Sequence, residues 1–155
     1  MTDAANPSLI VRIPTPLWLI GLVLVALGAD ALLRTQPVLK HWPTGVVVIA
    51  MGFAVSAWGR LAFRRHRAEI VPSSEKHATL VASGPFRFTR NPMYLGLVVI
   101  GIGAALVAGT WLMWLVPNVV FALDQFVIIP YEERSMARTF GEAYGEYRAR
   151  VRRWF

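Results

Sequence analysis

The chain has 155 residues, of which 55% are hydrophobic and only 16% are charged, with a formal net charge of +7 and no cysteine. One small core cannot bury so much apolar surface, and disordered chains have the opposite composition, so a soluble domain and a disordered chain are both excluded. Without cysteine, disulfides, thiolate metal sites and cysteine nucleophiles are excluded too. The composition predicts a single all-α membrane domain over residues 1–155.

Two apolar runs come first. The first is uncharged up to Ala29 and predicts a helix over 14–33, and the second, which ends at Arg60, predicts a helix over 43–63. Each is long enough to cross a hydrocarbon layer of ~30 Å. The first run also resembles a signal peptide with Ala29-Asp30-Ala31 as its cleavage site, although apolar residues continue beyond that site.

The third apolar run is longer, with 33 uncharged residues between Arg90 and Asp124. As one helix it would exceed the bilayer by roughly 20 Å, so the chain is expected to fold back on itself. The small residues at 108–110 predict the turn, between helices over 92–107 and 111–130. The sequence therefore predicts a multi-pass bundle of four transmembrane helices whose third and fourth form a tight hairpin.

The chain beyond this hairpin predicts an amphipathic helix over 131–150. Its apolar residues recur at helical spacing, while charged residues occupy the other positions. The apolar set is Met136, Phe140, Tyr144, Tyr147 and Val151. Gly141 and Gly145 weaken this helix, which is expected to lie against the membrane face or the bundle.

Basic residues predict the orientation, because cytoplasmic flanks and short loops of membrane proteins accumulate Lys and Arg. With four crossings, 14 of the 16 basic residues lie on one side and only Arg34 and Lys40 on the other. Both termini are therefore predicted to be cytoplasmic, in the inner membrane if the protein is bacterial. This topology explains the positive charge, so no nucleic acid is expected as a partner. Membrane lipids are the expected partners.

The polar residues gather at the cytoplasmic ends of the third and fourth helices. The predicted hairpin brings the segment ahead of Pro92 close to Glu132 and Glu133. Each part also has a structural interpretation, since Asn91 and Pro92 suit a helix start and the two glutamates suit the N-terminus of the tail helix. Gly101-Ile102-Gly103 lies inside an apolar helix, where glycine allows close packing rather than nucleotide binding.

Together these segments are more specific than each one alone. They comprise a Ser-Gly-Pro-aromatic turn at 83–86, Arg-Asn-Pro-Met-Tyr-Leu-Gly at 90–96, the apolar hairpin, Glu132-Glu133, and aromatic residues over 140–147. This combination resembles the isoprenylcysteine carboxyl methyltransferases and the related phospholipid N-methyltransferases, over roughly Thr79 to Phe155. The resemblance implies an enzyme that uses S-adenosylmethionine, releases S-adenosylhomocysteine, needs no metal and methylates N, O or S of a lipidic or small hydrophobic acceptor.

The resemblance also implies which residues surround the cofactor. They are Ala78, Thr79, Leu80, Val81, Phe86, Asn91, Pro92, Met93, Tyr94, Glu132 and Glu133. The chemistry agrees, since a carboxylate such as Glu132 suits a ribose diol and aromatic faces attract a sulfonium. Arg90, predicted to be catalytic, or backbone N–H groups near a helix start suit the methionyl carboxylate. Glu133 is expected to hold Arg90 or Arg87. His41, His66 and His77 lack ligand spacing, so no metal site is expected.

Two departures concern the acceptor. Asn91 stands where isoprenylcysteine enzymes have histidine, and Ile128 stands where they have an arginine that reads the substrate carboxylate. Asp124, Ile128 and Glu132 follow at i, i+4 and i+8 and so share a helix face. Asp124 is the second predicted catalytic residue, and the hypothesis is that it favours an amine acceptor. The alternatives are a pair with Arg60 or a place at the interface.

Two other function classes fit the composition. A small four-helix transporter could use Asp30 as a proton-coupled site, although a helix-pairing or snorkelling role suits that residue better. A purely structural membrane protein leaves the clustered Arg, Asn and Glu side chains unexplained. The methyltransferase interpretation accounts for both the apolar bundle and the polar cluster.

Overall fold

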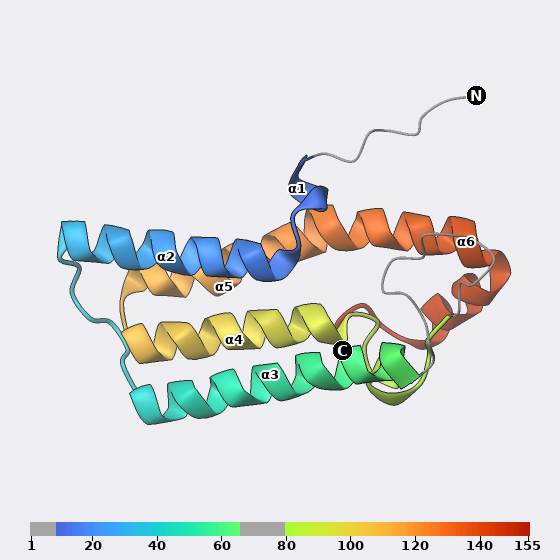
Figure 1. Ribbon diagram of the computed structural model, residues 1–155, viewed down its shortest axis with the longest axis horizontal. Coiled ribbons are helices and arrows are strands. Elements are labelled where there is room, and N and C mark those ends of the chain that lie inside the picture. The colour runs from blue at the N-terminus through green and yellow to red at the C-terminus, as the bar shows by residue number, and fades with distance from the viewer. Residues whose placement is uncertain (1–8, 66–79) are drawn as a thin grey trace.

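The structure, a computed structural model, describes residues 9–65 and 80–155, and in these ranges the chain is helical without strands. The elements are α1 (Leu9–Arg12), α2 (Thr15–Leu33), α3 (Trp42–Arg65), the 3-10 helix η2 (Gly84–Arg87), α4 (Pro92–Ala108), α5 (Trp111–Leu123), the π-helical turn η3 (Asp124–Ile128) and α6 (Ile129–Arg150). The long helices α2 to α5 run side by side and α6 extends beyond them (Figure 1). The predicted all-α class is confirmed.

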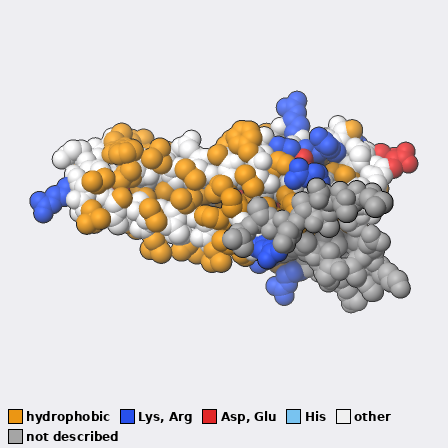
Figure 2. Space-filling model, turned by 90° about the horizontal axis from the view of Figure 1, so that it is seen from above, with side chains coloured by type: hydrophobic (Ala, Val, Ile, Leu, Met, Phe, Trp, Pro, Cys, Tyr) orange, Lys and Arg blue, Asp and Glu red, His pale blue; other side chains and the backbone are white. Residues whose placement is uncertain are grey.

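In the described part of the chain, three helical stretches are long and apolar enough to cross a membrane: α2, α3 and the continuous run Trp111–Arg150. The fourth apolar helix, α4, has 17 residues and spans only about 25 Å. Large apolar side chains on α2 and α3 point outward, with Val25 70% and Phe53 61% exposed. Figure 2 shows such side chains spread over the half of the molecule farther from the basic end. This apolar exterior confirms a membrane-embedded protein.

Glycines bring α3 and α4 into near backbone contact. Gly45, Gly52 and Gly59 lie seven residues apart on one buried face of α3. An added Cβ atom at Gly45 would lie 2.7 Å from the Gly103 carbonyl oxygen, and one at Gly52 would lie 2.6 Å from that of Gly96. The partner numbers fall as the α3 numbers rise, so the two helices are antiparallel. We call this contact the glycine seam.

The other glycine of the Gly101-Ile102-Gly103 motif serves packing as well. An added Cβ atom at Gly101 would lie 3.2 Å from the Pro117 side chain of α5. Gly103 belongs to the glycine seam on α3. The packing role that the sequence predicted for these two glycines is confirmed.

Asp30 connects the helices at the end of the bundle away from the basic residues. Its carboxylate accepts hydrogen bonds from the hydroxyls of Thr35 and Thr110. The loop after α2 is held to the α4–α5 connection by the Val38 amide, which donates to the Gly109 carbonyl at 2.7 Å. Asp30 thus has the helix-pairing role that suits it best from sequence.

The predicted boundary between a spanning helix ending at 130 and a separate tail helix over 131–150 differs from the structure. The chain continues from α5 through the π turn into α6, and the break falls at Gly141, with φ 53° and ψ −124°. The wider π turn lies just before Pro130, whose ring would otherwise clash with the preceding helical turn. Glycine adopts a positive φ at little cost, so Gly141 is where the helix bends.

Candidate active site

A cavity lies at the end of the bundle opposite Asp30, where α3, η2, α4 and α6 converge. We call it the first cavity, and its volume is about 80 Å³. It is lined by Phe63, Leu80, Val81, Phe86, Arg90, Asn91, Pro92, Met93, Tyr94, Glu132, Glu133, Met136, Phe140, Tyr144 and Tyr147. Ten of the thirteen predicted site residues are in this lining. Ala78 and Thr79 lie outside the described residues, and Asp124 does not line the cavity.

The Ser-Gly-Pro-aromatic segment forms the aromatic wall of the first cavity. Gly84 has a φ of 61°, a value that favours glycine, and it starts the 3-10 turn that carries Phe86 inward. The Phe86 ring packs edge-on against Phe63 of α3 at 5.1 Å between ring centroids. The Tyr147 hydroxyl donates to the Phe86 carbonyl at 2.8 Å.

Tyr94 and Glu132 meet although 38 residues separate them in the sequence. The Tyr94 hydroxyl donates to Glu132 Oε1 at 2.5 Å. Tyr94 lies in the first turn of α4 and Glu132 in the first turn of α6, so the fold-back after Ala108 determines their approach. A carboxylate and a phenol thus share one wall of the cavity.

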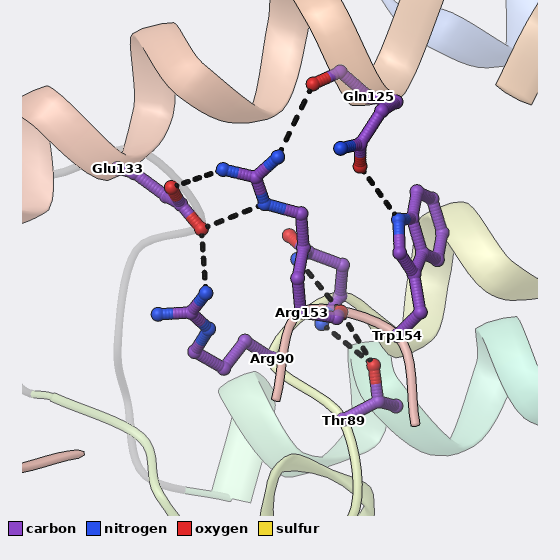
Figure 3. Close-up of polar contacts among 7 residues, drawn as sticks. Thr89, Arg90, Gln125, Glu133, Arg153 and Trp154 are labelled. Carbon is purple, nitrogen blue, oxygen red and sulfur yellow. Dashed lines mark hydrogen bonds and ion pairs between the residues drawn. The ribbon is translucent and has the colours of Figure 1, made fainter. Parts of the chain in front are cut away.

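Glu133 holds two arginines, as Figure 3 shows. Its Oε1 lies 3.0 Å from Arg90 Nη2, and its Oε2 lies 2.7 Å from Arg153 Nη2. The side chains of Arg90 and Glu133 are only 9% and 12% exposed. Arg90 Nε and Nη1 are buried without a hydrogen-bond partner among residues 9–65 and 80–155. Arg90 therefore keeps two donor nitrogens that no described residue satisfies.

The segment after α6 returns to the site, which the sequence did not predict. The Arg153 carbonyl accepts hydrogen bonds from Thr89 Oγ1 at 2.9 Å and Asn91 Nδ2 at 3.1 Å, and Trp154 Nε1 donates to Gln125 Oε1 at 2.7 Å (Figure 3). The Asn91 side chain thus holds this segment and makes no helix cap. A lone tryptophan after a run of arginines was the available sequence signal.

Asp124 is fully buried in the π turn and lies apart from the first cavity. Its carboxylate lies beside the Thr15 hydroxyl at the start of α2, without a hydrogen bond of ordinary geometry to any described residue. No ion pair joins it to Arg60 in the described part of the chain. The ion pair with Arg60, one of the alternative roles predicted for Asp124, is therefore absent among the described residues.

A second cavity, of about 550 Å³, lies behind the Tyr94–Glu132 pair. It shares Met93, Tyr94, Glu132 and Met136 with the first, so these four residues form a wall between the two. The remaining lining is Val11, Arg12, Ile13, Pro14, Thr15, Pro16, Ser56, Arg60, Leu97, Ile128, Tyr131 and Ser135. Sequence reasoning missed most of this set, because residues 11–16 resemble an ordinary helix flank.

Comparison with known families matches residues 39–143 to the phospholipid methyltransferases. The match covers two thirds of the chain and every predicted site residue. It includes α3 and ends within α6, so the family pattern begins earlier than Thr79. No curated protein and no solved structure matches the chain. The resemblance seen in the sequence is confirmed: the chain belongs to the phospholipid methyltransferase family of membrane methyltransferases.

Proposed function

We propose that the protein transfers a methyl group from S-adenosylmethionine to a lipid acceptor and that the first cavity is the cofactor site. The observation that carries this proposal is Arg90, whose buried Nε and Nη1 lack a partner among the described residues and whose guanidinium lines the cavity. Buried donors without partners are costly, and a ligand carboxylate satisfies them. The residues present therefore fit an amino-acid cofactor of this kind.

Each side chain has a role in this proposal. Arg90 binds the methionyl carboxylate and Glu132 accepts hydrogen bonds from the ribose hydroxyls. Phe86 and Tyr94 present aromatic surface to the sulfonium, which supplies an electrophilic methyl group when the cofactor is bound. Glu133 positions Arg90. The apolar part of the lining excludes water, which strengthens these electrostatic contacts; it consists of Leu80, Val81, Pro92 and Met93.

The size of the first cavity implies movement on binding. Ligand pockets usually measure about 300–1,000 Å³, several times the 80 Å³ found here. The cofactor therefore enters only when neighbouring side chains or the segments near Leu80 shift outward. Ala78 and Thr79, which precede Leu80, stay predicted cofactor residues.

For the membrane topology we propose four crossings, with α4 and α5 as a hairpin and both termini on the cytoplasmic side. The basic residues support this orientation, because among residues 9–65 and 80–155 only Arg34 and Lys40 lie at the Asp30 end. In a bacterium this would be the inner membrane. The site then faces the cytoplasm, where the cofactor is made. A transporter function has less support, since Asp30 is occupied by two hydroxyl donors.

Cofactor binding is the direct test. Detergent-purified protein should bind S-adenosylhomocysteine saturably in a calorimetric titration, and Glu132→Gln should weaken binding about 10-fold or more, because it removes a charged acceptor. Glu146→Gln is the matched control, since Glu146 is exposed on the same helix. An absence of saturable binding to the unchanged protein would overturn the proposal, as would equal affinities of the two variants.

Asp124 is proposed to favour an amine acceptor through its negative charge. Asp124→Asn keeps the size of the side chain and removes the charge, so we expect slower acceptor turnover with unchanged S-adenosylhomocysteine affinity. The measurement is methyl transfer from labelled cofactor to lipid amines in the purified enzyme. Unchanged turnover would show that Asp124 has only a structural role beside Thr15.

A further inference from the structure

The second cavity combines an apolar interior with a basic rim. Arg12, before α2, and Arg60, on α3, both line it and both are exposed. Arg60 makes no ion pair with any residue in the ranges 9–65 and 80–155. Between these arginines and the Tyr94–Glu132 wall the lining is mostly apolar, with side chains such as Ile13 and Leu97. This distribution suits a ligand with an anionic group at one end and an apolar body.

The position of the second cavity is equally informative. Arg60 is the first charged residue after the uncharged run of α3, so the rim lies where the apolar exterior gives way to the basic end. In Figure 2 basic side chains are seen at this transition. Amphiphiles in a bilayer place their anionic groups at the same level. A ligand from the membrane therefore reaches the rim without leaving the interface.

We infer that the second cavity is the acceptor site and that it takes an amphiphile whose anionic group binds Arg60 and Arg12 while its reacting end contacts the Tyr94–Glu132 wall. This inference rests on the proposed function, because the wall borders the cavity assigned to the cofactor. Arg60 has no ion-pair partner in the described part of the chain, and its positive charge favours an anionic ligand. The volume of about 550 Å³ suits a headgroup with the first part of its chains.

Residues 11–16 contribute to acceptor specificity from outside the region that matches the family. The family match begins at residue 39, yet the segment from the end of α1 to the start of α2, residues 11–16, supplies six of the lining residues of the second cavity. Both the arginine at position 12 and the apolar wall beside it come from this segment. Acceptor choice in this chain is therefore set in part outside the matched region.

Direct binding tests the inference without relying on turnover. The probe is labelled dihexanoyl phosphatidylethanolamine, in equilibrium dialysis against detergent-purified protein saturated with S-adenosylhomocysteine. Arg60→Gln should raise the dissociation constant about 10-fold, the effect of losing one charge-assisted contact. Arg64→Gln, an exposed arginine one turn further along α3 that lines neither cavity, should leave it unchanged. Equal binding to the Arg60 and Arg64 variants would overturn the inference.

Parallel binding experiments with other ligands show which anionic group the site binds. Dihexanoylglycerol, which has no anionic group, should bind weakly to unchanged protein and be insensitive to Arg60→Gln. Hexanoate, with a carboxylate, and hexyl phosphate show whether the site prefers one anion; sensitivity of either to Arg60→Gln supports the inference. If the uncharged ligand binds as tightly as the phospholipid, the site does not read an anion and the inference fails.

A cavity-filling variant provides an independent check of the location. Ser135 on α6 lines only the second cavity, so Ser135→Phe should block the phospholipid probe and leave S-adenosylhomocysteine affinity intact. Ala137→Phe is the control, because Ala137 is exposed on the same helix. Normal probe binding by Ser135→Phe would overturn the inference. A different outcome would overturn only the proposed cofactor site. In that outcome the unchanged protein does not bind S-adenosylhomocysteine but still binds the phospholipid probe in an Arg60-dependent way.

Discussion

Replacing Glu133 with alanine should lower the thermal midpoint of the detergent-purified protein by about 10 °C. The carboxylate holds Arg90 and Arg153, and the Arg90 guanidinium already has two nitrogens without a partner among residues 9–65 and 80–155. Removing one partner of a buried ion pair costs about 3–5 kcal/mol, and each kcal/mol corresponds to about 2–4 °C for a chain of this size. S-adenosylhomocysteine binding should fall as well, because Arg90 loses its orientation.

A double variant separates the stabilising role of the pair from its binding role. Replacing both partners of the more buried pair, as in Arg90→Leu with Glu133→Leu, removes the buried charges and leaves only Arg153, whose side chain is 24% exposed, without its carboxylate, so the double variant should recover part of the lost stability. It should not recover S-adenosylhomocysteine binding. Glu146→Ala, at an exposed position of α6, should change neither property. Recovery of binding in the double variant would contradict the role proposed for Arg90.

Substitution within the glycine seam should have the other large effect. A Cβ atom at Gly52 would lie 2.6 Å from the Gly96 carbonyl oxygen and 2.8 Å from the Ile100 amide nitrogen. Both neighbours are backbone atoms, so relief requires the two helices to separate. Gly52→Ala is therefore expected to cost about 3 kcal/mol, at the upper end for overpacking, and to lower the thermal midpoint by roughly 10 °C.

Gly21→Ala is the matched control for this substitution. Gly21 also lies inside an apolar helix, α2, but an added Cβ atom there meets nothing within 4 Å. The alanine should be neutral or slightly stabilising, because it favours the helix. Thermal unfolding followed by circular dichroism measures both variants. Equal midpoints for Gly52→Ala and Gly21→Ala would show that α3 and α4 are not packed as closely as the seam requires.

Sequence reasoning found the helices and most of the first cavity because both follow from local patterns. Uncharged runs of spanning length leave few alternatives to a helix, and a run too long for one crossing implies a fold-back. That fold-back brings Arg90 and Tyr94 toward Glu132 and Glu133. The ion pair between Arg90 and Glu133 is one of the two pairs that the sequence predicted for this glutamate.

Other features depend on contacts that the sequence does not display. Pro130 and the charges after it resemble a helix boundary, yet a π turn before the proline lets the helix continue to Gly141. The return of Arg153 and Trp154 to Thr89 and Gln125 joins distant segments through side-chain and backbone groups. Such long-range contacts arise from tertiary packing, which has no periodic signature.

The glycine seam also sets a length. Because α3 and α4 are nearly in backbone contact, they move as one body, and the Ser56 hydroxyl adds a 3.1 Å hydrogen bond to the Met93 carbonyl. Arg60 is carried by the first of these helices and Tyr94 by the second. The proposed anion contact and the wall where the acceptor reacts are therefore carried by two closely packed helices. In the proposed acceptor site, the anionic group must reach Arg60 while the nucleophile reaches the Tyr94–Glu132 wall. The site therefore selects lipids by the distance between these two groups in the headgroup.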